Sequence, residues 1–227
     1  MSATISEFLF FKVKPTVKPE DPSNAEGEAL LNALRTVNQH SGYKSSVWGR
    51  SVEDENTLVW VVDWTDARGS TISNSLTPFL DPSNSQPPIA LYATLTPPIS
   101  NTDTLTQNPV TELCILPFAS SLTTEETKQL HSDLISFRTT LVEQLPQTVG
   151  PRSWAMGHVD RPSTIKHGKS PSGMAVLHLL AVGWESVEAH MNAKQTEQFG
   201  RSIAPIREKM LGPVPGLELK HVRFQKV

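Results

Sequence analysis

Hydrophobic and polar positions alternate in a series that the chain runs through twice. The first series begins with an apolar run at residues 5–13 (ISEFLFFKV), which predicts a β-strand. Leu30, Leu34 and Val37 then recur at helical spacing, and Gly42 follows as a stop signal. The other strands of this series are predicted at residues 44–51, 57–64 and 88–96, with a short helical stretch after Trp64.

The second series starts with a predicted strand at residues 110–118. Thr123 and Glu126 have the spacing of a capping box, so a long helix is expected to begin there. Its apolar face is formed by Leu130, Leu134, Phe137, Leu141 and Leu145. Further strands are predicted at 151–159, 173–184 and 216–224, and a helical region at 185–211 that is interrupted near Pro205.

The two series match at individual residues, which predicts an internal duplication. The matching pairs are Glu7 with Glu112, Gly49 with Gly157, and Trp64 with Trp184. The second copy is longer because it carries an inserted hairpin loop, RPSTIKHGKSPSG. A linker rich in Pro, Thr and Asn at 97–109 separates the copies, so we expect one module at 1–98 and another at 109–227.

Each copy has the element order β-α-β-β-α-β, which is that of the ferredoxin-like fold. Both helices of such a module cover one face of its sheet, and the other face needs a partner. Two modules in one chain can cover each other. We therefore predict an α+β protein in which two tandem ferredoxin-like modules pack sheet-to-sheet as an intrachain dimeric α/β barrel. The expected oligomeric state is a monomer with an internal pseudo-twofold axis or a homodimer.

One junction between a strand and a helix resembles a known family. The segment at 182–199, VGWESVEAHMNAKQTEQF, is similar to the third-strand-to-second-helix junction of the dimeric α/β-barrel superfamily, particularly its antibiotic-biosynthesis-monooxygenase-like branch. VVDWTDARGS at 61–70 resembles the same junction in outline. The resemblance implies cofactor-independent chemistry on hydrophobic small molecules, such as oxygenation of aromatic polyketides, cyclisation or isomerisation in secondary metabolism.

The chain departs from the patterns of the family at two motifs. The stretch MNAKQ at 191–195 stands where cyclase-type members have His-Pro-x-x-His, which places the mechanism of those cyclases in doubt. The haem-degrading members use an Asn on the first strand, where this chain has Glu112.

Composition narrows the function classes. The 227 residues include 20 Lys and Arg against 23 Asp and Glu, a net charge of −3, which argues against a nucleic-acid partner. No apolar run approaches the roughly 20 residues needed to span a bilayer, so no membrane partner is expected. The N-terminal residues lack the pattern of a signal peptide, which favours a cytoplasmic protein. The single cysteine, Cys114, lies in an apolar run and is expected to be structural.

His190 is the leading candidate for a catalytic group. It borders the buried stripe of the helix that follows Trp184, where an imidazole could transfer protons inside a cavity between helix and sheet. The alternative is a half-buried histidine bonded to backbone. The equivalent position in the first copy is Ser70, so we expect an active second half and a degenerate first half.

Other candidates surround this position. His178, on an apolar strand face, and Glu112, on the first strand of the second copy, are expected to assist catalysis; for each, a purely structural role is the alternative. Substrate contacts are expected from Trp154, His158, Trp184, Met174 and Arg161. If the hairpin strands are in register, His158, His178, Trp154 and Trp184 surround one pocket. Arg161 belongs to a basic loop that could clamp an acidic substrate or close as a lid.

The chain offers no sequence pattern for a metal or a cofactor, since its histidines are scattered and no glycine-rich phosphate loop occurs. The favoured hypothesis is a cofactor-independent enzyme acting on an aromatic or polyketide-like small molecule. The alternatives are a protein that binds a hydrophobic metabolite without turnover, and a structural module whose barrel is filled by its own side chains.

Overall fold

A computed structural model describes residues 4–65, 73–99 and 103–227. The strands are β1 (Ile5–Lys12), β2 (Tyr43–Ser51), β3 (Thr57–Trp64), β4 (Ile89–Thr96), β5 (Val110–Ala119), β6 (Ser153–Arg161), β7 (Ile165–Lys166), β8 (Met174–Trp184) and β9 (Lys220–Lys226). The α-helices are α1 (Ala25–Arg35), α2 (Ser73–Leu76), α3 (Asp103–Gln107), α4 (Thr124–Thr139), α5 (Val187–Lys194) and α6 (Glu197–Lys209). Short 3₁₀ turns cover Thr36–Gln39 and Thr77–Phe79, and a π-helical turn, Thr140–Gln144, extends α4.

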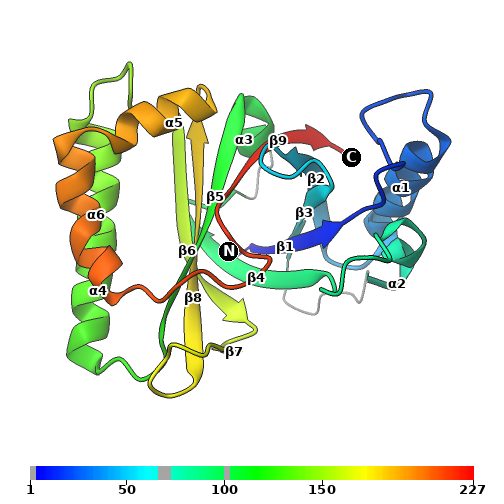
Figure 1. Ribbon diagram of the computed structural model, residues 1–227. Helices are drawn as coiled ribbons and strands as arrows, with labels where there is room; N and C mark the ends of the chain where they lie inside the picture. The colour runs from blue at the N-terminus through cyan, green and yellow to red at the C-terminus, as the bar shows by residue number, and fades with distance from the viewer. Residues whose placement is uncertain (1–3, 66–72, 100–102) are drawn as a thin grey trace.

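Eight antiparallel strands close into a barrel. Their order is β5-β9-β2-β3-β1-β4-β6-β8, and β8 pairs with β5 to complete the ring. The short β7 pairs with the beginning of β8. The helices lie on two opposite sides of this barrel, α4 and α6 on one side and α1 and α2 on the other (Figure 1). The protein is therefore an α+β barrel, as expected.

The same strand order occurs in each half of the chain. The first half is ordered β2-β3-β1-β4 and the second half β9-β5-β8-β6. Two seams join the halves, β2 with β9 and β4 with β6. At these seams Gly49 and Gly157 allow close approach, because a Cβ atom on either one would collide with the backbone carbonyl of Arg223 or Thr94 in the other half.

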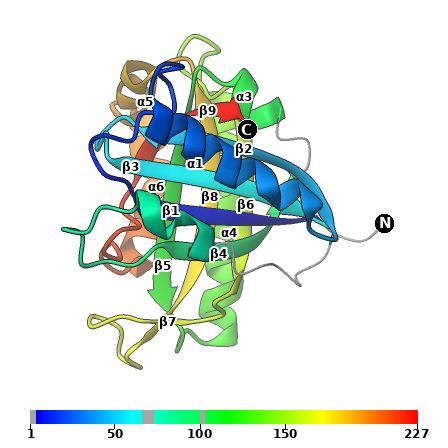
Figure 2. The same cartoon turned by 90° about the vertical axis from the view of Figure 1, so that its right-hand side faces the viewer.

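Three hydrophobic clusters fill the molecule, because successive side chains of a strand point to opposite faces. Phe8 and Phe10 of β1 point into the barrel, whereas Leu9 and Phe11 pack toward the helices of the first half. Figure 2 shows α1 lying across the strands of that half. The third cluster lies between the second-half sheet and helices α4 and α6, and includes Phe137.

The predicted strands overlap the observed ones, although the last begins at Lys220 and not at residue 216, and the predicted linker at 97–109 contains helix α3. The helical region after Trp184 differs more. It breaks at Gln195 and Thr196, and Pro205 lies inside α6. The break falls earlier because the hydroxyl of Thr196 accepts a hydrogen bond from the backbone N–H of Phe199 and so caps a new helix. The capping box of Thr123 and Glu126 is present at the start of α4, as expected.

The inserted loop is anchored to the body of the protein. Its β7 pairs with the beginning of β8, and Ile165 packs against the cluster inside the barrel. The ring of His167 hydrogen-bonds the carbonyl of Gly212 at 2.9 Å. These contacts give no support to the expectation that the basic side chains of the loop clamp an acidic substrate.

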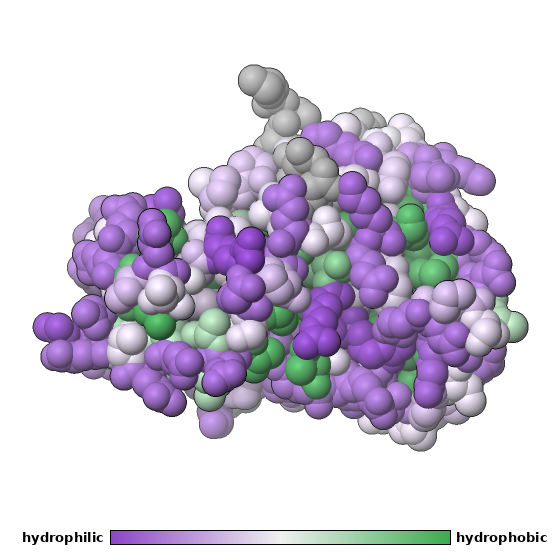
Figure 3. Space-filling model, turned by 90° about the horizontal axis from the view of Figure 1, so that it is seen from above, coloured by the Kyte–Doolittle hydropathy of each residue, from purple (hydrophilic) through white to green (hydrophobic). Residues whose placement is uncertain are grey.

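The surface seen in Figure 3 is mostly hydrophilic, with hydrophobic side chains in small separate groups. Within the described ranges, no helix is both long enough and apolar enough to cross a bilayer.

Candidate active site

A cavity of about 350 Å³ lies between the second-half sheet and helices α4 and α6. This volume is within the range of small-molecule sites. Its walls are mostly apolar and include Phe137, Trp154, Leu180 and Phe199. The polar side chains that line it are Glu112, His190, Lys194, Arg207 and Glu218. A cavity beside His190 is what an enzyme or a binding protein needs, and it weighs against a barrel filled entirely by its own side chains.

Glu112 and His190 meet at the wall of this cavity. The two side chains come from β5 and α5, and His190 Nε2 lies 3.4 Å from Glu112 Oε2. The side chain of Ser186 caps α5 through the N–H of Ala189 and so fixes where the helix begins. The His190 ring then stacks on Trp184, with ring centres 4.8 Å apart and an angle of 18° between the planes.

Trp184 also holds the carboxyl group of Glu112. Its indole N–H donates to Glu112 Oε2 at 3.0 Å. Glu112 Oε1 has no hydrogen-bond partner among the described residues, so this oxygen is left for a ligand.

Burial determines how both groups titrate. It raises the pKa of Glu112 from 4.5 to about 7, although the hydrogen bond from Trp184 opposes the rise. Burial, together with the smaller effects of the neighbouring His221 and Lys194, lowers the pKa of His190 to about 3. At neutral pH the imidazole of His190 is therefore uncharged, while Glu112 exchanges its proton near the pH at which an acid–base catalyst works best.

Two further residues extend the site, and neither was identified from the sequence. The Nδ1 atom of His190 is 2.8 Å from Nε2 of His221, which lies on β9 beside Glu112. The Nδ1 atom of His221 is 2.5 Å from Glu53 Oε1, in the turn between β2 and β3 of the first half. Glu53 also accepts hydrogen bonds from the backbone N–H of His221 and from the hydroxyl of Ser51.

The hydrogen bonds define which ring nitrogens carry protons. Burial raises the pKa of Glu53, but the bonds from His221 and Ser51 outweigh this and lower it, so Glu53 is a carboxylate and only accepts. His221 then donates from Nδ1, and in the uncharged form of this ring Nε2 accepts a hydrogen bond from Nδ1–H of His190. The remaining nitrogen, Nε2 of His190, then carries no proton and lies 3.4 Å from Oε2 of Glu112, where it can accept a proton from the protonated carboxyl group.

The first half contains a related arrangement at equivalent positions. Trp64 donates its indole N–H to Glu7 at 2.9 Å, as Trp184 does to Glu112. Tyr92, paired with Glu7 as His221 is paired with Glu112, donates its hydroxyl to Glu7 at 2.6 Å. Ser70, the expected counterpart of His190, lies outside the described residues.

Comparison with family models and with curated protein sequences found no significant match. Solved structures do match over nearly the whole chain. An anthrone oxidase-like protein has a TM-score of 0.60 at 12% identity, covering 100% of this chain and 94% of its own. A candidate chlorite dismutase has 0.56 at 12% identity, covering 100% and 96%. A candidate monooxygenase from Fusobacterium nucleatum has 0.53 at 12% identity, covering 99% and 93%.

The chain shares the α/β-barrel fold of these structures. At these identities the similarity concerns the fold alone.

The α/β barrel does not bring His178 and His158 to the cavity of His190. They pair across β6 and β8, with ring centres 5.2 Å apart, and line a different hollow together with His131 of α4. Trp184 is six residues further along β8, about 20 Å away at roughly 3.3 Å per residue. His178 is therefore too far to assist His190, although burial lowers its pKa to about 4.

The expected single pocket around His158, His178, Trp154 and Trp184 is therefore not formed. Trp154 lines the cavity of His190, and Trp184 supports Glu112 from behind it.

Met174 and Arg161 lie elsewhere as well. Met174 pairs with Lys166 of β7 at the far end of β8. The guanidinium of Arg161 lies 3.7 Å above the ring of Tyr92, in the first-half arrangement. Neither residue lines the cavity.

Cys114 lines the cavity, but burial strongly raises the pKa of its thiol, which keeps it protonated and unreactive. Among the described residues, no three His, Cys, Asp or Glu side chains are placed to hold a metal ion. Both ring nitrogens of His190 already face other groups.

Proposed function

We propose that this protein is an enzyme that removes or transfers a proton on a hydrophobic small molecule bound in the second-half cavity. One observation carries the proposal: the Glu112–His190 pair lies at the wall of an apolar cavity, with Oε1 of Glu112 unoccupied. Glu112 acts as the base, and His190 exchanges protons with it. Trp154 and Phe137 provide flat apolar surfaces against which an aromatic ring packs.

The substrate is an aromatic or polyketide-like molecule that carries an acidic group. Lys194 and Arg207 line the cavity, and neither forms an ion pair or a hydrogen bond with another described residue. An unpaired cation beside an apolar cavity attracts a carboxylate or a phenolate. Lys194 also lies close enough to lower the pKa of Glu112, which indicates that its charge acts inside the cavity.

Oxygenation and cyclisation or isomerisation both begin with this proton transfer. Loss of a proton from an activated carbon gives a carbanion, which can react with O₂ directly or attack another carbon of the same molecule. The names of the similar barrels, a candidate monooxygenase and an anthrone oxidase-like protein, favour the reaction with O₂. Oxidation of an anthrone to an anthraquinone consumes one O₂ and releases one water.

We assign the first half, residues 1–98, to a ferredoxin-like module that serves as a scaffold, and residues 109–227 to the active module. The strand order of the two halves supports this division. Trp60 stands where the second half has Leu180, and Trp48 where it has Met156, by the matching of the copies. Both tryptophans are buried against helix α1, so bulky side chains occupy the space that forms the cavity in the second half.

The experiment measures O₂ uptake and product mass when the purified protein is given anthrone in air. We expect anthraquinone to form, and the substitutions Glu112→Gln and His190→Ala to slow the reaction by about 10²–10⁴-fold. His131→Ala, an exposed histidine on α4, is the matched control and should leave the rate unchanged. Equal rates in the His190→Ala variant and the unmodified protein would refute the assignment.

Binding without turnover is the second candidate, because the cavity alone would suffice for it. Small-molecule extracts of cells with and without the gene distinguish the two functions. A precursor with one oxygen fewer than the lost product indicates an oxygenase; for an anthrone the precursor also has two hydrogens more. A precursor and product of equal mass, or differing by one water, indicate a cyclase, isomerase or dehydratase. If no metabolite changes and ligand binding survives in His190→Ala, the protein is a carrier.

A further inference from the structure

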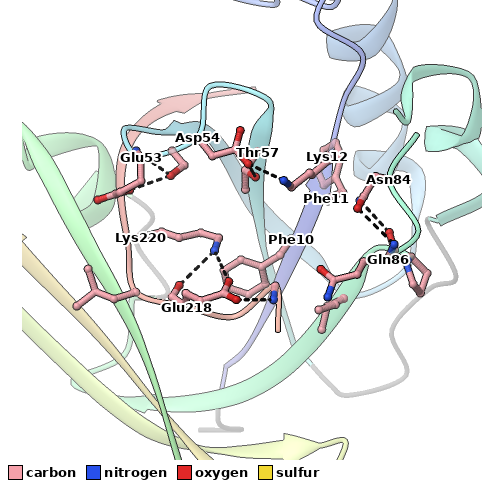
Figure 4. A pocket seen from close by; sticks show the side chains of 15 residues that line it. Phe10, Phe11, Lys12, Glu53, Asp54, Thr57, Asn84, Gln86, Glu218 and Lys220 are labelled. Carbon is pink, nitrogen blue, oxygen red and sulfur yellow. Dashed lines mark hydrogen bonds and ion pairs between the residues drawn. The ribbon is translucent and has the colours of Figure 1, made fainter. Parts of the chain in front are cut away.

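A line of neighbouring polar groups leads from the cavity to a second pocket, with two hydrogen bonds and one contact of 3.4 Å along it. It runs from Glu112 through His190 and His221 to Glu53. Glu112 and His190 line the cavity, whereas Glu53 lines the second pocket, where it is labelled near the end of β2 in Figure 4. The line therefore joins the cavity to a second pocket, and Glu218 and Leu219 line both of them.

The two ends of the line differ in their access to water. The side chains of His190 and His221 are 2% and 4% exposed, and that of Glu112 is 10% exposed. The side chain of Glu53 is 42% exposed. Only the Glu53 end can exchange protons freely with bulk water while a ligand fills the cavity.

The second pocket itself is not a convincing ligand site. Its charged side chains pair with one another, Lys12 with Asp54 at 2.8 Å and Lys220 with Glu218 at 3.5 Å (Figure 4). Glu53 instead directs its carboxylate at His221, which binds it through both Nδ1 and the backbone N–H.

We propose that His221 and Glu53 form a proton path that connects Glu112 in the cavity to the solvent. The catalytic meaning of this path rests on the proposed function, but its existence does not. Glu53 and His221 are positioning and relay residues, since only Glu112 and His190 reach the cavity.

The proton balance of one passage is simple. The proton on Glu112 moves to Nε2 of His190, the proton on Nδ1 of His190 moves to Nε2 of His221, and the proton on Nδ1 of His221 moves to Glu53. Glu112 is left as a carboxylate that accepts the substrate proton on Oε1. Glu53 gives its proton to water, so one proton enters at the cavity, one leaves at the surface, and both rings are left protonated at Nε2. When Oε1 of Glu112 later returns its proton to the reacting molecule, the same steps in reverse carry a proton from water to Oε2 of Glu112 and restore Nδ1–H on both rings, so a full cycle consumes and releases no net proton. The distance of 3.4 Å between His190 and Glu112 must shorten by about 0.5 Å for the first transfer.

The first half shows that the fold does not require this path. Ser51 and Val159 are equivalent positions at the two seams, where they pair with Val222 and Ala93. Glu53 and Arg161 each follow two residues later and are therefore equivalent as well. Arg161 is a permanent cation and Tyr92 bonds Glu7 directly, so the described residues around Glu7 form no such line of acceptors and donors. The pair of Glu53 and His221 therefore accompanies the site that has the cavity and has no equivalent among the described residues around Glu7.

A structural role for Glu53 makes the opposite prediction about proton exchange. If Glu53 merely held β9 in place, its loss would loosen the site and let water reach the buried imidazoles faster. If Glu53 is the outlet, its loss would close the route and slow the exchange.

The test uses the full chain labelled with ¹⁵N at histidine, without any ligand. NMR correlation spectra should show His190 and His221 both protonated at Nδ1 near pH 7. Water exchange of the Nδ1 proton of His190 should be slowed by about tenfold or more in Glu53→Gln, since assistance by a positioned acid–base group is worth at least that. Glu55→Gln removes the same charge from an exposed residue of the same turn and should leave the rate unchanged.

Protonation of either ring at Nε2 in the resting, ligand-free protein would overturn the path, because the first transfer needs Nδ1–H on both rings, and this measurement needs no variant that folds. Unchanged or faster exchange in Glu53→Gln would overturn it as well. Because no substrate is present, these outcomes are independent of the anthrone assay: a working path with no turnover would refute only the proposed enzyme.

Discussion

Trp184 donates its indole N–H to Glu112 at 3.0 Å, across the paired strands β8 and β5. The bond fixes a carboxyl group that would otherwise be free to rotate within an apolar wall. Trp64 and Glu7 make the same bond at 2.9 Å in the first half. Both halves have this bond, so it is a shared feature of the two halves of the barrel. In the second half the histidines His190 and His221 lie beside it.

The substitution Trp184→Phe removes this donor while keeping an aromatic ring for His190 to stack on. The buried carboxyl of Glu112 loses a partner, so we expect the free energy of unfolding to fall by about 1–3 kcal/mol. The pKa of Glu112 should rise further, because the lost bond lowers it. Chemical denaturation and the pH profile of the reaction measure the two effects. Trp64→Phe is the matched control: it should destabilise similarly but leave the pH profile unchanged.

The raised pKa of Glu112 makes part of the stability depend on pH. Its pKa is about 7 in the folded protein against an ordinary value of 4.5, so the folded state binds the proton more tightly. The stabilisation is fully present below about pH 4.5 and is lost as the pH rises through 7. Its total size is about 3 kcal/mol, from 1.36 kcal/mol for each pKa unit.

Comparison with Glu112→Gln isolates this contribution, because the other titrating groups are common to both proteins. Those groups include His190, whose lowered pKa acts oppositely and costs stability as the pH falls below 6.5. Between pH 4.5 and 7, the free energy of unfolding of the unmodified protein should therefore fall relative to that of the variant. A difference that stays constant over this range would show that Glu112 titrates normally.

The sequence predicts the barrel well because the duplication is recorded in local patterns. Strand β3 lies at the residues expected for it, and the capping box identifies the start of α4. Glu112 and His190 could be singled out because each is a titratable group in an otherwise apolar element. Their meeting depends on how α5 packs on the sheet, which local patterns do not specify.

His221 and Glu53 could not be found in this way. They are 168 positions apart and meet only because β9 pairs with β2 of the other half. The grouping of His178 with Trp184 was wrong for a related reason, since residues on one face of a strand can still be 20 Å apart along it, at roughly 3.3 Å per residue. The duplication offers one indication that the sequence could have given. Glu7 and Glu112 occupy matching positions in the two halves, and the residues paired with them, Tyr92 and His221, are both polar.

A larger side chain at Leu180 should close the cavity. Leu180→Trp reproduces the residue that the first half has at this position, Trp60, which is fully buried there. We expect the protein to fold and the affinity for the fluorescent probe 1-anilinonaphthalene-8-sulfonate to fall by more than about tenfold, or about 1.4 kcal/mol. Fluorescence titration measures this. Unchanged affinity would mean that the probe binds outside the cavity.

The charges at the cavity select for an acidic group on the ligand. In the double variant Lys194→Gln with Arg207→Gln, we expect the affinity for 1-anilinonaphthalene-8-sulfonate to fall by about three- to tenfold, since these side chains are partly solvated and their attraction is screened. N-phenyl-1-naphthylamine has the same rings without the sulfonate, and its affinity should not change. Arg201→Gln removes an exposed cation from the outer face of α6, where it pairs with Glu197, and should affect neither probe. Equal losses for both probes would show that the double variant alters the shape of the cavity, and the substrate would then need no acidic group.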